Sequence, residues 1–369
     1  MGKSKNTVDA ETLRTWLENK EPVFVLDVRP PSEREEWQIP GSHYLDAYKR
    51  LNDGDKSVLE EIEIPDNVKV VTVCAAGKTS QIASKALKEK GVDAFSLEGG
   101  MKAWSKAWNI ARKQFPDFEV LQIRRTGKGC LSYILSSGNE AVIVDASLQT
   151  SIYKELIQRY GLSVKYVIET HVHADHLSRS KQVADLFKVP LFLPVPNKVK
   201  YSHNPITENT SFKVGTTILK SLSTPGHTVE SYCFYIENAI LVTGDTIFTN
   251  GVGRPDLKAE AEQTRVKAEL LYHSVKKLLS LPGHVFILPA HTNNPVDFDG
   301  KMITTTISEA KANISLLSSN EHEFITALLV KIPPTPANYL SIVEKNLTGN
   351  FSEFESDDLE VGANRCAIS

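Results

Sequence analysis

The sequence has few cysteines, no excess of charge of one sign and no long apolar run. Its four cysteines, Cys74, Cys130, Cys233 and Cys366, never form a Cys-x-x-Cys pair, which excludes a disulfide framework and a cysteine-based structural zinc site. Lysine and arginine number 42 against 45 aspartates and glutamates, so neither nucleic acid nor a membrane surface is expected as a partner. No apolar run reaches the roughly 18 residues of a membrane-spanning helix, and the polar N-terminus lacks the apolar core of a signal peptide. Together these absences predict a soluble, cytoplasmic protein.

The length and composition predict a globular chain of more than one domain. At roughly 150 residues per domain, 369 residues correspond to two domains or three. Apolar residues make up 41% of the chain, which excludes a disordered or collagen-like protein. The first part alternates a helix at 11–20, strands at 23–28 and 68–73, and a helix at 80–90 that ends before Gly91. This order of helices and strands predicts a parallel sheet and an α/β fold.

The second part is richer in strands and again α/β. Strand patterns occur at 120–124, 132–135, 141–144, 165–168, 217–222, 239–242 and 285–288. The last four of these run directly into loops that contain histidine or aspartate. From 303 onward the pattern is helical, interrupted by the prolines of 333–336 before a last helix near 339–346. We therefore predict one domain at 1–112, a linker at 113–118 and a second domain at 119–369.

The densest group of possible metal ligands is Thr170-His-Val-His-Ala-Asp-His176. On an extended stretch His171 and His173 point the same way, while Asp175 and His176 can turn toward a neighbouring point. Further candidates, each in a loop after a later strand, are His227, Asp245 and His291. Imidazole and carboxylate ligands without cysteine suit zinc, iron or manganese. The alternative is that these side chains only satisfy loop backbone groups, but three imidazoles and a carboxylate so close together favour a metal site.

A second candidate site is the loop Cys74-Ala-Ala-Gly-Lys-Thr-Ser80, which follows a β-branched strand and opens a helix. Backbone N–H groups of such a loop and the helix dipole stabilise a thiolate or a persulfide on the cysteine. Lys78 adds a positive charge, and Thr79 or Ser80 can cap the helix. The alternative is an inert cysteine that behaves as a small hydrophobic residue at a strand end.

The ligand motif resembles a known superfamily. His-x-His-x-Asp-His, followed by Pro-Gly-His-Thr, Gly-Asp and Pro-Ala-His, is similar to the metallo-β-lactamase superfamily, whose fold is an αββα sandwich with metal at the sheet edges. Within it, the stretches 251–256, 271–275, 281–283 and 363–367 resemble the persulfide dioxygenases, iron enzymes that oxidise glutathione persulfide to sulfite. The resemblance covers residues 119–368.

That resemblance implies roles for individual residues. It implies one Fe(II) per chain on His171, His227 and Asp245, and it places Arg254 near the substrate; the alternative for Arg254 is a solvated or structural ion pair. The remaining ligand-type residues would surround these ligands or hold a second metal; they are His173, Asp175, His176 and His291. Where the family often has Asp-Tyr after its last histidine, this chain has Thr292-Asn293, which leaves open whether the thiol carrier is glutathione or coenzyme A.

The N-terminal part resembles a different family. The stretches 26–29, 39–42 and 97–104, together with the Cys74 loop, are similar to a rhodanese domain over residues 5–110. The resemblance implies that Cys74 carries sulfane sulfur as a persulfide and that Gly77, Lys78, Thr79 and Ser80 bind its substrate. Many rhodaneses have an arginine in this loop; Lys78 and Thr79 stand in its place, so the anionic donor, thiosulfate or another, stays open.

Together the two resemblances predict a sulfur-metabolism enzyme. One half would oxidise a thiol persulfide with O2 to sulfite and thiol, and the other would move sulfane sulfur between sulfite, thiosulfate and a thiol through Cys74. Two alternatives stay open: a thioesterase of the glyoxalase II type with two zinc ions, and a persulfide carrier or sensor without turnover. The resemblance also suggests a homodimer or homotetramer.

Overall fold

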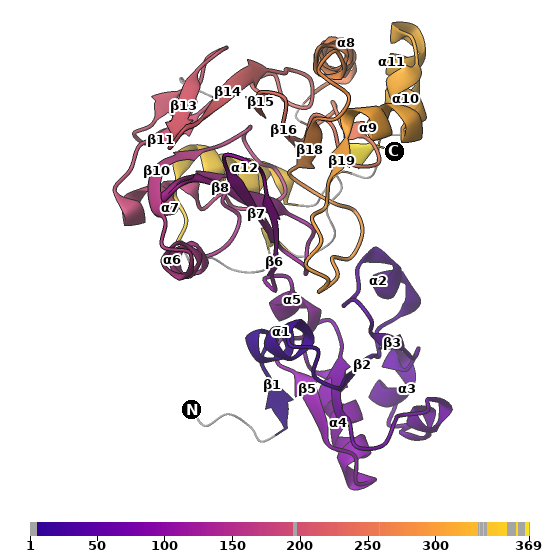
Figure 1. Ribbon diagram of the computed structural model, residues 1–369. Helices are drawn as coiled ribbons and strands as arrows, with labels where there is room; N and C mark the ends of the chain where they lie inside the picture. Colours follow the sequence, from indigo (N-terminus) through magenta and orange to yellow (C-terminus); the bar gives the residue numbers. More distant parts are fainter. Residues whose placement is uncertain are drawn as a thin grey trace.

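The computed structural model describes residues 6–194, 198–257, 259–330, 332, 335, 338–352, 359–360 and 366–368. The smaller N-terminal part and the larger part that follows it form two bodies joined end to end (Figure 1). The three prolines predicted to break the tail, at 333, 334 and 336, and residues 363–365 of the tail motif lie outside the described residues. Within the described ranges no helix is both long and apolar enough to cross a membrane.

The N-terminal part is built on a parallel sheet, as the alternation of helices and strands predicts. In the described residues its strands run in the order β1 (Thr7–Val8), β5 (Ala94–Leu97), β4 (Lys69–Val73), β2 (Val23–Asp27) and β3 (His43–Tyr44). The connecting helices are α1 (Ala10–Glu18), α2 (Pro31–Glu36), α3 (Tyr48–Asn52), the 3-10 helix η1 (Ser57–Glu61), α4 (Thr79–Glu89) and α5 (Gly100–Trp104). Successive residues of β2 point to opposite faces, so Phe24 and Val25 belong to two different buried clusters.

The second part contains two larger sheets. In the described residues the first has the order β12 (Asn204–Pro205), β11 (Leu191–Leu193), β10 (Ser163–Ile168), β9 (Glu140–Val144), β8 (Leu131–Ser137), β7 (Glu119–Arg124) and β6 (Asn109–Gln114). The second has the order β13 (Ser211–Val214), β14 (Thr217–Ser223), β15 (Tyr232–Ile236), β16 (Ile240–Gly244), β18 (Phe286–Pro289) and β19 (Thr305–Thr306). A short pair, β17 (Val252–Gly253) and β20 (Ala367–Ile368), lies apart from both.

These two sheets pack face to face and carry helices on their outer faces. Side chains such as Tyr133, Phe212 and Phe234 form the buried layer between the sheets. The outer face of the first sheet is covered by α6 (Thr150–Arg159), α7 (Ser180–Phe187) and α12 (Tyr339–Thr348). The second is covered by α8 (Ala261–Leu279), α9 (Ile307–Asn313), α10 (Ser315–Ser318) and α11 (Glu321–Val330). The αββα sandwich that the resemblance implies is therefore confirmed (Figure 1).

The segment between the two parts is more ordered than a linker. Asn109–Gln114 forms β6 and pairs antiparallel with β7 along its whole length, so the residues predicted to end the first domain and begin the linker run as an edge strand of the larger part. Buried contacts also join the parts: the Trp37 indole N–H donates to the Thr126 carbonyl at 3.0 Å, and Arg125 Nε donates to the Ser105 carbonyl at 2.7 Å. The domain bounds themselves stay a prediction.

Candidate metal centre and cysteine site

The sandwich brings the predicted ligands to one edge, because each follows the end of a strand. The His171 loop follows β10, His227 follows β14, Asp245 follows β16 and His291 follows β18. All four side chains are buried. Residues as far apart in the sequence as His171 and Asp245 therefore lie close enough together, with His227, to hold one metal ion.

Three of these residues form a compact donor set. Asp245 Oδ2 lies 3.7 Å from His171 Nε2 and 3.4 Å from His227 Nε2. Their other ring nitrogens are fixed: His171 Nδ1 lies 2.9 Å from Thr170 Oγ1, and His227 Nδ1 donates to the Arg254 carbonyl at 2.8 Å. Both His171 Nε2 and Asp245 Oδ2 are buried without a hydrogen-bond partner. Buried polar atoms that converge without partners fit a cation held between them.

The charge states of this set suit metal binding. Burial lowers the pKa of His171 and of His227, so both imidazoles are neutral and keep a lone pair for a metal. Burial raises the pKa of Asp245, but His291 and His171 outweigh it and hold the pKa below its ordinary value. Two neutral imidazoles and one carboxylate form the ligand set that leaves open positions on non-haem iron.

The second donor set is held together by its own hydrogen bonds. Asp175 Oδ2 accepts from His176 Nδ1 at 3.0 Å, from His291 Nε2 at 2.7 Å and from the Cys130 thiol at 3.3 Å. His291 Nδ1 in turn donates to Asp245 Oδ1 at 2.6 Å. Although burial lowers the pKa of His291, Asp175 and Asp245 raise it well above its usual value. His291 therefore sits as a cation between two carboxylates and aims Asp245 Oδ2 at His171 and His227.

Sequence reasoning missed two thiols in this region. Cys130 lies with Asp175, His176 and His291 in one group of possible ligands, and Cys366 lies with Asp245 and His291 in another. Cys130 and His291 also form an isolated antiparallel bridge. The sequence carried one signal for Cys366, its place in the 363–367 motif, and none for Cys130.

Two predicted site residues lie outside both donor sets. His173 contacts His171 ring to ring, with 4.3 Å between centroids, and its Nε2 is 3.3 Å from Asp145 Oδ1. Arg254 is 0% exposed and is paired with Asp256 through Nε at 2.8 Å and Nη2 at 2.7 Å. The structure thus gives Arg254 a part in holding His227 through its carbonyl, and its guanidinium does not line the pocket beside His227; a substrate-binding role for it stays a prediction.

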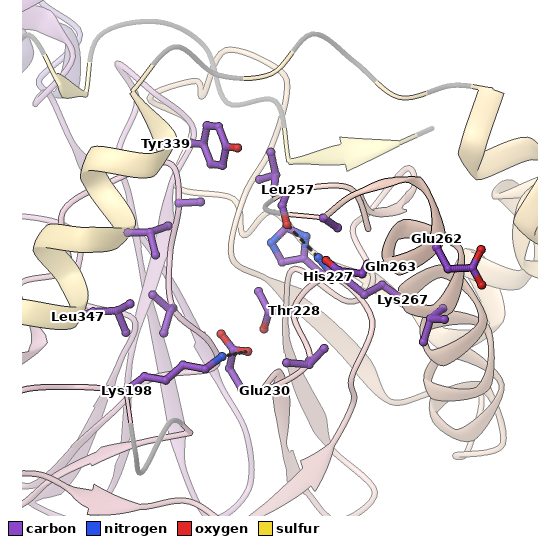
Figure 2. Close-up of a pocket in the computed structure, with 16 residues that line it drawn as sticks. Lys198, His227, Thr228, Glu230, Leu257, Glu262, Gln263, Lys267, Tyr339 and Leu347 are labelled. Carbon is purple, nitrogen blue, oxygen red and sulfur yellow. Dashed lines mark hydrogen bonds and ion pairs between the residues drawn. The ribbon is translucent and has the colours of Figure 1, made fainter.

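A pocket of about 390 Å³ opens beside His227 (Figure 2). Its wall is mainly apolar, with Val172, Leu257 and Val343 among its residues. Lys267 also lines it; Lys267 Nζ donates to the Leu257 carbonyl at 3.2 Å, and burial lowers the pKa of this amine to about 8. An apolar pocket with a few charged groups next to a metal centre is typical of a small-molecule site.

The Cys74 loop has the conformation expected of an anion-stabilising loop. Cys74 is 2% exposed, and its sulfur accepts from the Gly77 N–H at 3.1 Å and lies 3.3 Å from Ser80 Oγ. Gly77 has φ +83°, and a Cβ there would lie 3.0 Å from the Gly99 nitrogen, so this position requires glycine.

Of the other predicted loop residues, only Ser80 has its side chain beside the Cys74 sulfur; Lys78 and Thr79 do not. The Lys78 side chain is exposed, and Thr79 Oγ1 donates to Asn52 Oδ1 at 3.2 Å. The expectation that Thr79 or Ser80 caps the following helix is wrong, because the N-cap of α4 is Lys78 and no side chain caps the helix. The Ser80 hydroxyl is instead shared between Cys74 and Ser96, which lies 2.8 Å away.

The fold and the two sites define a metallo-β-lactamase-fold protein joined to a rhodanese-like domain. The model of the rhodanese-like domain matches residues 9–107, and that of the metallo-beta-lactamase superfamily matches residues 125–291. The mitochondrial persulfide dioxygenase of Mus musculus is 32% identical over 209 residues, which is 54% of this chain and 77% of the mouse protein. The chain therefore belongs to the persulfide dioxygenase family and carries an additional N-terminal rhodanese-like domain.

Solved structures agree on the fold of the larger part. A metallo-beta-lactamase from Staphylococcus aureus is 25% identical, with a TM-score of 0.56, over 65% of this chain and 73% of that one. The ETHE1 protein of Myxococcus xanthus is 24% identical, with a TM-score of 0.55, over 63% of this chain and 99% of that one.

Proposed function

We propose that this protein is an iron-dependent persulfide dioxygenase that also transfers sulfane sulfur. Its substrate would be a low-molecular-weight thiol persulfide of the glutathione or coenzyme A type. The balanced reaction is RSSH + O2 + H2O → RSH + sulfite + 2 H⁺, in which the terminal sulfur is oxidised and O2 is reduced. Membership of the persulfide dioxygenase family supports this reaction class.

The observation that carries the proposal is the division of the buried donors into two unequal sets. In the first set His171 Nε2 and Asp245 Oδ2 have no hydrogen-bond partner and converge with His227 Nε2. In the second set Asp175 Oδ2 is bonded to both His176 and His291, although His176 Nε2 also lacks a partner. This arrangement favours one metal ion per chain. A ferrous ion on these three ligands would supply open positions at which a sulfur anion and O2 bind and are activated.

The chain's own residues would orient the substrate from the side of His227. The apolar wall of the adjacent pocket excludes water and receives the arm of the thiol carrier. Lys198 Nζ lies 3.9 Å from Glu230 Oε2 in the same wall, so one group of each charge is available for the polar ends of a carrier (Figure 2).

In the rhodanese-like domain, Cys74 would accept sulfane sulfur as a persulfide. The Gly77 N–H and the Ser80 hydroxyl stand within hydrogen-bond distance of its sulfur and would stabilise the anion. A persulfide is then the chemical species that both domains handle. The buried contacts of Trp37 and Arg125 across the junction keep the two domains in one assembly.

Metal analysis combined with oxygen uptake tests the proposal. Protein purified without added metal is expected to hold one iron per chain and to consume O2 when glutathione persulfide or coenzyme A persulfide is added. His171→Ala should remove both the iron and the oxygen uptake, while His284→Ala, a change of an exposed histidine that bonds the Asn238 carbonyl, should alter neither.

Two outcomes would replace the proposal. Two zinc ions per chain with hydrolysis of a glutathione thioester would identify a hydrolase of the glyoxalase II type. An iron-loaded protein that binds persulfide sulfur on Cys74 but consumes no O2 would identify a carrier or sensor.

A further inference from the structure

A second pocket, of about 360 Å³, lies where the two domains meet, and neither candidate site uses it. Its wall comes from both domains: Glu11 of α1 and Lys106 after α5 on one side, and Arg125, Ser147 and Glu360 on the other. This volume is within the range of small-molecule sites. It shares no wall residue with the pocket beside His227.

Two buried side chains in this wall have polar atoms without partners. Arg125 is 1% exposed; its Nε and Nη1 donate to the Ser105 carbonyl and to Glu360 Oε1 at 2.7 and 2.9 Å, but its Nη2 has no hydrogen-bond partner. Ser147 is 4% exposed, and its Oγ has no partner. A guanidinium only donates, so the group that Arg125 lacks is a hydrogen-bond acceptor.

The start of a helix adds backbone donors to the same wall. Helix α6 begins at Thr150, and Gln149 and Ser151 on either side of that position line the pocket. Gln149 is the N-cap, and no side chain caps the helix. Helix N-termini with open N–H groups attract anions.

The charges deepest in the pocket leave an excess of positive charge. Arg125 and Arg179 share one carboxylate, that of Glu360, at 2.9 and 3.7 Å. Burial raises the pKa of Glu360, yet the positive charges of Arg125 and Arg179 lower this pKa to about 2. The electrostatic potential at the Glu360 carboxylate is therefore positive. The other two acidic residues of the wall have cations of their own: Glu11 pairs with Arg14, and Glu155 pairs with Arg159.

We propose that this interdomain pocket binds an oxyanion, held by Arg125, Ser147 and the first turn of α6. The ligand is either a free oxyanion, such as sulfite, thiosulfate or sulfate, or the phosphate group of a larger molecule. The inference does not depend on the dioxygenase reaction, because it rests on donors and charge alone. We favour a free sulfur oxyanion as the ligand, since the proposed reactions of both domains produce or consume such anions.

Titration calorimetry of the iron-loaded full chain with sodium sulfate tests the pocket, because sulfate is inert toward Cys74 and iron. We expect one sulfate per chain, with a Kd of about 1 mM or tighter. Ser147→Ala should weaken binding roughly threefold to tenfold through the loss of one hydrogen bond. Ser163→Ala, at an exposed serine at the start of β10 and outside the pocket wall, is the matched control and should leave the Kd unchanged.

Crystals soaked in selenate locate the anion independently of any variant, so the test holds even where Ser147→Ala weakens the fold. An anomalous peak beside Arg125 and Ser147 supports the site. Coenzyme A that binds at least tenfold tighter than sulfate and competes with it would identify a phosphate ester as the ligand, and equal affinities would identify a free oxyanion. No saturable sulfate binding, a selenate peak elsewhere, or equal weakening by Ser147→Ala and Ser163→Ala would overturn the proposal.

Discussion

Gly253 is the position where the smallest change is expected to disturb the metal centre most. It lies in β17, next to Arg254, whose carbonyl holds His227. A Cβ at Gly253 would lie 2.0 Å from the Asp245 carbonyl oxygen and 3.0 Å from His227 Cβ. Since real Cβ contacts are not shorter than 3.0 Å, the Asp245 backbone would have to retreat by about 1 Å. One methyl group thus displaces two of the three proposed ligands.

We expect Gly253→Ala to lower the affinity for Fe(II) by roughly 10–100-fold, as changes that displace ligand supports do. A displacement of about 1 Å at the reacting centre should also reduce the rate of oxygen uptake by about 100-fold. Fe(II) affinity is measured by competition with a chelator, and the rate with an oxygen electrode under saturating iron. The overpacking itself costs roughly 1–3 kcal/mol, so circular dichroism should show a folded chain.

Gly283→Ala is the matched control, because there the new Cβ would lie 2.1 Å from Ser308 Oγ, a hydroxyl that can rotate away. It should retain iron and activity. If Gly253→Ala bound Fe(II) as tightly as the parent chain, the placement of His227 and Asp245 around one metal ion would be wrong.

Three further changes test other parts of the structure. His291→Ala should lower Fe(II) affinity roughly 10–100-fold, because Asp245 loses the hydrogen bond that orients it; unchanged affinity in a chelator competition would refute this. Cys74→Ser should abolish thiosulfate:thiol sulfur transfer and leave oxygen uptake intact, whereas Cys233→Ser, at a buried cysteine among threonines, should preserve both activities. Glu360→Gln should destabilise the protein by roughly 3 kcal/mol near neutral pH by breaking a buried ion pair. Since the pKa of Glu360 is lowered from 4.5 to about 2 in the fold, that difference in urea unfolding should be full above about pH 4.5 and shrink as the pH falls toward 2; a constant difference would contradict it.

The grouping of the candidate ligands could be predicted because each candidate is tied to a local signal. Strand patterns end just before His171, His227 and Asp245, and strand ends meet at the edges of sheets. The place of Cys130 could not be predicted in this way. Cys130 lies beside the candidate ligands because it forms an isolated β-bridge with His291, 161 residues further along the chain. The residue pattern of neither segment predicts that pairing.

The strand at Asn109–Gln114 was not predicted from the sequence for a different reason. The alternation of apolar and polar residues in this segment is weak, and Arg112 and Gln114 are exposed. In the described residues β6 is the edge strand of its sheet and pairs with β7 alone. An edge strand of this kind carries few apolar residues, so its sequence is hard to separate from a polar connection. The pocket at the junction could not be predicted from the sequence either, since Arg125, Ser147 and Glu360 belong to separate segments that only the complete fold brings together.

The choice between one metal ion and two depends on His291. A two-metal hydrolase needs one nitrogen of His291 and one oxygen of Asp175 as ligands of the second ion, yet these two atoms lie 2.7 Å apart and bond to each other. The other nitrogen of His291, Nδ1, is hydrogen-bonded to Asp245 Oδ1 at 2.6 Å and holds the ring in place. A second ion would therefore have to break the hydrogen bond between His291 Nε2 and Asp175 without any movement of the ring. A single ion on His171, His227 and Asp245 would require neither change, because His171 Nε2 and Asp245 Oδ2 have no hydrogen-bond partner to lose. In this chain His171, His227 and Asp245 therefore form the candidate ligand set, and Asp175, His176 and His291 form a hydrogen-bonded group beside it.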